Sequence, residues 1–469
     1  MHLTMARLIE GKTLDQDPPP TLEDLAADGF LQLTPQDIVS EKVTAALQRF
    51  DQKYPDVKPK ERVKKLEEHL RQASQIYDVL LPEQRQELGY LTTVYAFAKF
   101  KPEANGVRLI PSLRFLKKVG LEDSEYLLAG LSNAVIQTVE TEGAYCLLEA
   151  VNVAVEMVEK AGSHCGHQSK GMKIKQVQEA ENGFGSESED MAVQTVEGRA
   201  YHFGEKSKRM NVRTVVNAGS NFGNESVDMV VGTVEHAGMY FGSLSSGMRV
   251  THIQKAFSYV GDGSKYFSLE KIEDVGDGFG QKSTSMSVQE IVAAEGNCGS
   301  GSDNMAITKI GTVGDRFGSK SSKLRCDSIG KAGAKFGEES TEMHIGTLAE
   351  VGEYCGLKSE SSYFDRIGMA AKGLGEQSKW LTLRTLGTVD KEDLCKNAQF
   401  TTIFEAPLDI PYKQILQAKN GSSYVIRTVD GKIYSDIPED SLKRLEIRFQ
   451  FNPYAETLAL LQPTPARKK

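Results

Sequence analysis

Residues 184–202 read FGSESEDMAVQTVEGRAYH, and residues 203–221 read FGEKSKRMNVRTVVNAGSN. The two segments align without a gap, and Phe, Gly, Ser and Met return at the same places after 19 residues. Stepping by 19 residues in both directions extends the pattern to twelve copies, whose first residues run from Cys165 to Leu374. We number the positions of this repeat 0 to 18, with Phe184 at position 0. A fixed period without insertions predicts a repeat architecture.

A few positions carry the pattern. Position 1 is glycine and position 4 is serine in all twelve copies, position 0 is mostly Phe, position 7 is mostly Met, and positions 9 and 12 are mostly aliphatic. Position 15 is Ala or Val in every copy except at Arg199. The residues that we expect to form the structural core of the repeat are Phe184, Gly185, Ser188, Met191, Val193, Val196, Phe203, Gly204, Ser207, Phe222, Gly223, Ser226, Phe241, Gly242, Ser245, Phe279, Gly280, Ser283, Phe317, Gly318, Ser321, Phe336, Gly337 and Ser340.

The spacing favours strands over helices. On one helix the apolar positions 7, 9, 12 and 15 would scatter around the axis, whereas in a strand positions 7 and 9 point to the same side. Glycine suits tight corners, and no proline lies between Pro111 and Pro407, as expected where every coil donates backbone N–H groups to its neighbour. We predict a mainly β fold, a parallel β-solenoid of about twelve 19-residue coils.

The block Phe184-Gly185-x-x-Ser188 resembles the aliphatic-Gly-x-x-small hexapeptide of left-handed β-helices. The other two sides of the coil do not follow that hexapeptide, so right-handed forms stay open. The resemblance is to β-solenoid (β-helix) repeat proteins as a class and to no specific family.

The ends differ from the middle. We expect a flexible arm over 1–40, a helical N-terminal domain over 41–126, the solenoid over 127–390, a small C-terminal α+β cap domain over 391–460 and a disordered tail over 461–469. Residues 127–164 hold two degenerate copies that also fit a helical cap. Strands are expected at 400–404, 424–429, 432–434 and 445–451, with a hairpin turn at Asp430-Gly431.

Composition narrows the function classes. Lys plus Arg total 56 and Asp plus Glu total 64, so the net charge of −8 argues against nucleic acid as a partner. No apolar stretch is long enough to span a bilayer, and the N-terminus lacks the apolar core of a secretory signal. Six cysteines without close pairs suit a reducing compartment. We therefore expect a soluble, cytoplasmic protein without membrane insertion.

The cysteines, the histidines and the glycine cluster are explained by the repeat better than by a catalytic, metal or cofactor site. Cys165, Cys298 and Cys355 occupy the Phe column, whereas Cys395 follows the last copy. His164 and His167 flank Cys165 but fall on variable positions, so no metal site is expected. The glycine cluster at 276–283 resembles a P-loop but lacks the glycine before its lysine, so no cofactor is expected.

We therefore expect a non-enzymatic structural scaffold or protein-interaction protein on a rigid solenoid shaft, acting through a protein partner or self-association. No catalytic residue is identified, since the twelve copies pass without the loop excursion that usually carries function on such folds. The alternative is a β-helix enzyme or assembly factor, either a hexapeptide-type acyltransferase or an iron–sulfur cluster scaffold.

Overall fold

The computed structural model describes residues 40–58, 61–102, 107–390, 394–399, 401–406, 424–428 and 433–435. The chain forms two compact units, Met1–Gly280 with Met286–Val288 and Gln281–Ser285 with Gln289–Lys469. The predicted arm up to residue 39, the Asp430-Gly431 turn, the strand at 445–451 and the tail over 461–469 lie outside the described residues.

The first unit begins with helices, as predicted. They are α2 (Glu41–Lys53), α3 (Arg62–Ser74), α4 (Pro82–Lys99) and the 3-10 turns η2 (Tyr77–Val79) and η3 (Leu113–Val119). Ser40 starts α2 because its hydroxyl accepts a hydrogen bond from the Lys42 N–H at 3.3 Å. Helix α2 lies within the predicted helical domain over 41–126, and its Val43, Ala46 and Phe50 keep a helical spacing and are buried. No helix among the described residues is long and apolar enough to cross a membrane.

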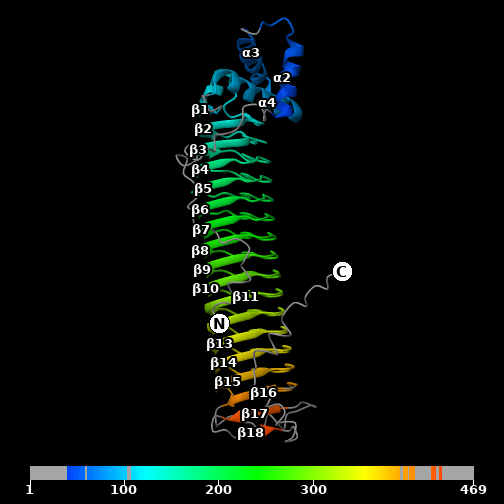
Figure 1. The fold of residues 1–469 in the computed structure, drawn as a ribbon, viewed down its shortest axis with the longest axis vertical. Coiled ribbons are helices and arrows are strands. Elements are labelled where there is room, and N and C mark those ends of the chain that lie inside the picture. Colours follow the sequence, from blue (N-terminus) through cyan, green and yellow to red (C-terminus); the bar gives the residue numbers. More distant parts are fainter. Residues whose placement is uncertain are drawn as a thin grey trace, which may run out of the picture. The chain divides into compact units, whose positions relative to one another are not determined.

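Parallel strands follow in the same unit, stacked one above the next (Figure 1). They are β1 (Arg108–Ser112), β2 (Ser132–Thr141), β3 (Val151–Ala161), β4 (Lys173–Val177), β5 (Ala192–Val196), β6 (Asn211–Asn217), β7 (Val230–Ala237), β8 (Arg249–Ala256) and β9 (Ser268–Val275). Partners from β2 onward start 19 residues apart, as Ser132 and Val151 do. Because β2 and β3 lie in the two degenerate copies, residues 127–164 form coils and not a helical cap.

The second unit continues the same pattern. Its strands are β11 (Ala306–Val313), β12 (Arg325–Ala332), β13 (His344–Val351), β14 (Tyr363–Ala370), β15 (Thr382–Val389), β16 (Thr401–Ala406), β17 (Tyr424–Thr428) and β18 (Ile433–Ser435), while β10 (Ser287–Ala294) contains the division between the units. The strands β17 and β18 pair antiparallel, as the predicted hairpin requires. Over the part of the chain that the structure describes, the fold is a parallel β-solenoid of about 14 turns.

The coil survives the point where the sequence repeat is lost. Thr382 of β15 pairs with Thr402 of β16, a step of 20 residues instead of 19. Cys395 then occupies position 1: it is buried, and its N–H donates to the Leu374 carbonyl at 2.8 Å. One additional residue therefore hid a further coil, and the same burial explains Cys395, which the repeat had left unexplained.

Another local shift explains the Arg199 exception. Ala200, one residue later, is buried and bridges to Ala218, whereas Arg199 is exposed. The Phe184 coil thus places its inward alanine one residue late, and no charge enters the core.

Identical side chains stack in the core. The rings of Phe184, Phe203, Phe222 and Phe241 are buried and parallel, and the Phe203 and Phe222 centroids are 4.9 Å apart with planes at 4°. In the longer strands every third residue is buried, as in Ile307, Ile310 and Val313 of β11. An inward period of three is not that of a flat strand, so each strand bends around the core.

Left-handed backbone recurs at positions 1, 3, 6 and 18 of each coil. The Glu187 N–H at position 3 donates to the Glu205 carbonyl of the following coil at 2.8 Å. The Gly185 N–H at position 1 donates to the Cys165 carbonyl of the preceding coil, also at 2.8 Å. These conformations turn successive N–H groups up and down the stack, which keeps the corners hydrogen-bonded despite a cost of about 1 kcal/mol for each non-glycine residue.

Only position 1 requires glycine, and the reason is the methionine column. A Cβ on Gly185 would lie 2.8 Å from Sδ of Met191, because position 1 faces the core. In the degenerate copy that starts at Cys146, position 7 is the smaller Val153, and position 1 carries a buried Leu147 with φ of 58°. Glycine at position 1 therefore leaves room for a long side chain at position 7, and a larger residue stands at position 1 where position 7 is smaller.

The Val260 coil shows a second exchange of volume and yields a prediction. Val260 stands in the Phe column and Phe267 in the Met column, and both are buried. We expect Val260→Phe to destabilise the protein by about 1–3 kcal/mol through overpacking, and Phe267→Met to destabilise it through lost packing. The double variant should return to within about 1.5 kcal/mol of the wild type in denaturant-induced unfolding, because the total side-chain volume is nearly conserved and the pair matches the other coils.

A matched control is Val212→Phe, which overpacks a coil that is not adjacent to Phe267. Its effect should add to that of Phe267→Met without compensation. If the effects of Val260→Phe and Phe267→Met on the free energy of unfolding were also additive, the proposed exchange of volume between these two positions would be contradicted.

Candidate functional site

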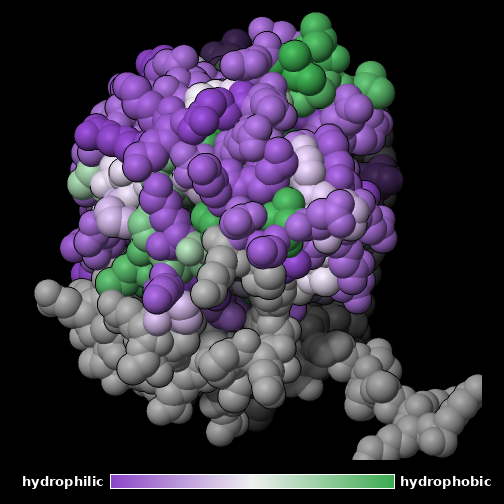
Figure 2. All heavy atoms as spheres, turned by 90° about the horizontal axis from the view of Figure 1, so that it is seen from above, coloured by the Kyte–Doolittle hydropathy of each residue, from purple (hydrophilic) through white to green (hydrophobic). Residues whose placement is uncertain are grey.

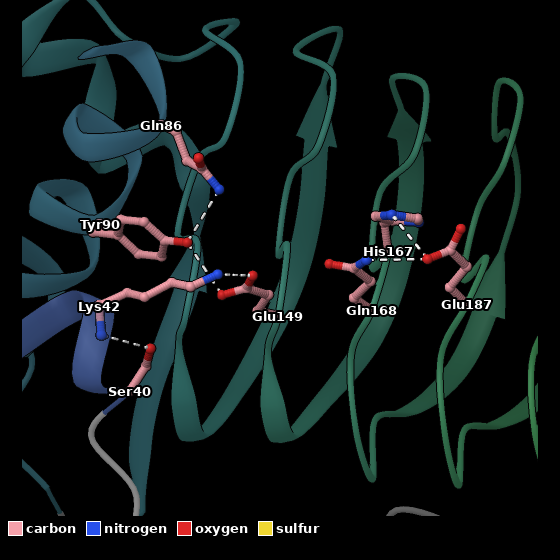
Figure 3. Close-up of polar contacts among 8 residues, drawn as sticks. All are labelled: Ser40, Lys42, Gln86, Tyr90, Glu149, His167, Gln168 and Glu187. Atoms are coloured by element: carbon pink, nitrogen blue, oxygen red, sulfur yellow. Dashed lines mark hydrogen bonds and ion pairs between the residues drawn. The ribbon is translucent and has the colours of Figure 1, made fainter. Parts of the chain in front are cut away.

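The helices are fastened to the first coils by polar contacts of Glu149. Its carboxylate accepts hydrogen bonds from Lys42 Nζ of α2 and from Tyr90 Oη of α4, the latter at 3.1 Å, and Gln86 donates to Tyr90 Oη at 3.2 Å (Figure 3). Burial, followed by the neighbouring Glu149 carboxylate, raises the pKa of Tyr90, so its hydroxyl remains a donor. This cluster joins helices to solenoid and has the character of a structural anchor.

Position 3, which Glu149 occupies in its coil, continues in later coils that no described helix contacts. Glu187 stands at position 3, two coils after Glu149, and has a similar φ, 56° against 54°. Its carboxylate lies 3.8 Å from His167 Nε2 and accepts a hydrogen bond from Gln168 Nε2 at 3.0 Å (Figure 3). The column thus offers an internal comparison between a carboxylate that holds the helices and one that does not.

The histidines at 164 and 167 form a stack rather than a ligand set. The His164 ring lies 4.9 Å from that of Tyr145 at 12°, and His167 meets His164 edge-on at 5.7 Å. The Nδ1 atoms of both histidines are buried without a hydrogen-bond partner. The His164 ring extends over Gly183, where a Cβ would lie 2.5 Å from Nδ1. Among the residues that the structure describes, no three His, Cys, Asp or Glu side chains gather as a metal site would require.

All six cysteines are buried, and none of them forms a disulfide. Burial raises the pKa of Cys326 and of Cys395 to about 12, and it also raises the pKa of Cys355. A thiol with a raised pKa is a poor nucleophile and a poor metal ligand at neutral pH. The cysteine side chains therefore serve packing.

The serines of position 4 and the glycines of 276–283 are also accounted for by the coil. Ser188 Oγ donates to the Gly185 carbonyl of its own coil at 2.6 Å, and the other bonded serines of the column do likewise. Ser169, Ser226 and Ser359 of this column have no hydrogen-bond partner for Oγ. In the P-loop-like stretch Phe279 is buried at position 0. These residues belong to the framework.

A cluster of exposed apolar side chains does stand out on one corner of two neighbouring coils. We call Met239, Tyr240, Leu244, Phe257 and Tyr259 the corner patch. The exposed fractions are 40% for Met239, 39% for Tyr240, 60% for Leu244 and 66% for Phe257, whereas Tyr259 is half-buried. Single exposed apolar residues are ordinary, whereas a group of them on neighbouring coils is unusual.

The corner patch is held together by the coil itself. Tyr240 and Tyr259 occupy position 18 of successive coils, and their rings stack with centroids 5.1 Å apart at 10°. Ser243, which precedes Leu244, donates its N–H to the Tyr240 carbonyl at 3.2 Å and its hydroxyl to the Tyr259 carbonyl at 2.6 Å. The patch is therefore mounted on a hydrogen-bonded frame and needs little ordering on contact.

The stacking also determines which part of the Tyr259 ring is exposed to solvent. One face of Tyr259 is covered by Tyr240, and its ring also extends over Gly278, where a Cβ would lie 2.7 Å from Cδ1. Between these neighbours the Tyr259 ring presents its edge. Stacking of a sugar ring on an aromatic face is disfavoured at Tyr259 for this reason.

The charged residues at the corners of the two coils that carry the corner patch, and of the coil after them, are mostly acidic. At the outward corner positions (2, 3, 5, 6 and 16–18) of the three coils from 222 to 278, the charged residues are Glu225, Asp228, Asp262, Asp277 and Lys265. Glu225 and Asp228 are exposed, and Asp262 and Asp277 are half-buried. The patch therefore has an apolar centre and a predominantly acidic rim.

The helical end presents a different surface. Figure 2 looks down on that end of the first unit, where polar side chains predominate and apolar ones gather locally. The exposed large apolar residues of the helical segment are Val63, Ile76, Val79 and Leu81, all of them aliphatic. None of these four exposed residues is aromatic or a methionine, unlike those of the corner patch.

The sequence reading did not find the corner patch. Its signal was present: positions 16 to 18 carry Phe257-Ser258-Tyr259 in one copy, whereas the copy two coils earlier carries Gly219-Ser220-Asn221. Apolar residues at positions expected to face solvent are the feature to look for.

Replacing Glu149 should loosen the helices specifically. Glu149→Ala removes the acceptor of Lys42 and Tyr90, and we expect α2 and α4 to lose about 1–3 kcal/mol of protection in hydrogen–deuterium exchange. Glu187→Ala is the control, since it makes the same change in the same column with a similar φ. Equal effects of the two variants on the helices would contradict the anchor.

The histidine stack predicts a dependence of stability on pH. Burial, followed by the nearby His167, lowers the pKa of His164 below its ordinary value of 6.5; the other charged neighbours are Glu205, His202 and Glu187. A lowered pKa means that the folded state binds fewer protons than the unfolded state, so stability is present above pH 6.5 and falls below it.

His164→Tyr keeps a stacking ring, as Tyr145 shows, and removes this titration. The melting temperature of the variant should therefore fall less than that of the wild type between about pH 7 and pH 5. If the melting temperatures of the wild type and the variant changed equally with pH, His164 would not contribute to the pH dependence of stability.

A scan against protein-family models finds no match to this chain, and searches of curated proteins and of solved structures find none either.

Proposed function

We propose that the protein is a structural scaffold that binds a protein partner through the corner patch. The observation that carries the proposal is the exposed aromatic and methionine cluster at Met239, Tyr240 and Phe257, which has the composition of interface cores. A frame of stacked rings and backbone hydrogen bonds supports it, and preorganised surfaces lose less entropy on binding. The regular coils act as the support for this surface.

The neighbouring copies supply substitutions that the fold already accepts. Position 17 is Ser220 and position 18 is Asn221 in one copy, and position 16 is Ala371 in another. The triple variant Met239→Ser/Tyr240→Asn/Phe257→Ala therefore removes the apolar centre and leaves the coil intact. A matched control is Tyr354→Asn/Met369→Thr in the second unit, because Tyr354 shares position 18 and Met369 is exposed.

Cross-linking in intact cells, quantified by mass spectrometry, tests the proposal. We expect at least one protein to be recovered with wild type and control, with a cross-link mapped to the patch, and to fall at least about tenfold with the triple variant, the loss of roughly 1.4 kcal/mol or more. Equal recovery with all three proteins would overturn the proposal. An unchanged melting temperature shows that the triple variant is folded.

A further inference from the structure

The charge around the corner patch selects among partners. Residues 219–278 contain eight Asp and Glu against four Lys and Arg, a net charge of −4, which is half of the −8 of the whole 469-residue chain. At the outward corner positions of these coils the imbalance is four carboxylates to one amine. An apolar centre with such a rim presents a negative potential around a hydrophobic contact.

We infer that the corner patch binds a basic amphipathic segment of a partner protein, with apolar side chains on the patch and Lys or Arg side chains toward the acidic rim. This inference rests on the proposed function and specifies the chemistry of its partner. Glu225 and Asp228 are exposed, and the Glu225 N–H donates to the carbonyl of Ser243, the residue before Leu244, at 2.9 Å, so Glu225 lies next to the patch and a cationic side chain can extend toward it.

The same charges disfavour a second copy of the chain as the occupant. A two-fold contact would place the patch of one copy on the patch of the other. Glu225 and Asp228 would then face a rim of the same sign, and like charges across an interface are repulsive. A basic partner removes that repulsion and is favoured for this reason.

Other copies of the repeat again supply substitutions that these positions accept. Lys206 and Arg209 hold positions 3 and 6 in the copy before Glu225 and Asp228, so Glu225→Lys/Asp228→Arg reverses two rim charges with residues that these columns already accept. In the second unit Glu339 and Glu342 hold the same two positions, after Lys320 and Lys323. Glu339→Lys/Glu342→Lys is the matched control, because it reverses two charges at the same positions far along the chain.

The probes are two synthetic peptides of about 18 residues with one apolar leucine face, one with lysines and one with glutamates on the other face. Fluorescence anisotropy with the full chain should show binding of the lysine peptide, and at least about tenfold weaker binding of the glutamate peptide. Glu225→Lys/Asp228→Arg should weaken binding of the lysine peptide about tenfold, as should raising the salt concentration, whereas the control reversal should not.

Three results would overturn the inference. Equal binding of the two peptides would show that charge does not select, and an unchanged affinity after Glu225→Lys/Asp228→Arg would place the contact elsewhere. A dimer in sedimentation that Tyr240→Asn disperses would assign the patch to a second copy. If neither peptide binds while the cellular partner still depends on the patch, the basic-segment inference fails and the scaffold proposal stands.

Discussion

The backbone hydrogen bond from each coil to its neighbours is the interaction on which the rest of the structure depends. It fixes the spacing of the coils at about 4.8 Å and their register at 19 residues, so every side chain lies over its counterpart in the next copy. Stacked Phe rings, and stacked tyrosines on the surface, follow from that register. The cost is a corner backbone with left-handed residues in each coil, which is tolerated because those residues direct their N–H groups to adjacent coils.

Inside the coils, side chains are replaced in pairs. Glycine at position 1 leaves room for the long Met191 at position 7, as at Gly185, while Leu147 at position 1 stands with the smaller Val153. Val260 and Phe267 exchange sizes between two columns of one coil. Close packing explains these exchanges, since volume lost at one inward position can be supplied by another of the same coil. Copies can therefore lose the sequence signature and still form a coil.

The sequence could predict the features that recur in every coil and little else. The period of 19 residues predicts the parallel coils and the inward columns, because a shift of one residue would turn them out of the core. It does not predict the coil at Cys395, where a single additional residue ends the alignment, or the late alanine at Ala200. The corner patch escaped for a different reason: its residues stand at outward positions, where copies differ freely and the period carries no information.

That freedom is also the physical reason to place function at the corner patch. Outward positions accept Gly, Ser, Asn, Lys or Tyr without disturbing the coil, so nothing in the fold demands Met239, Tyr240 or Phe257. Exposing large apolar side chains to water is unfavourable and promotes aggregation. The stability of the fold gains nothing from this exposure. The acidic residues at its margin raise solubility and at the same time oppose self-association. A surface that is apolar at its centre, charged at its rim and unnecessary for folding has the properties of a recognition surface, and the stacked coils hold it rigid.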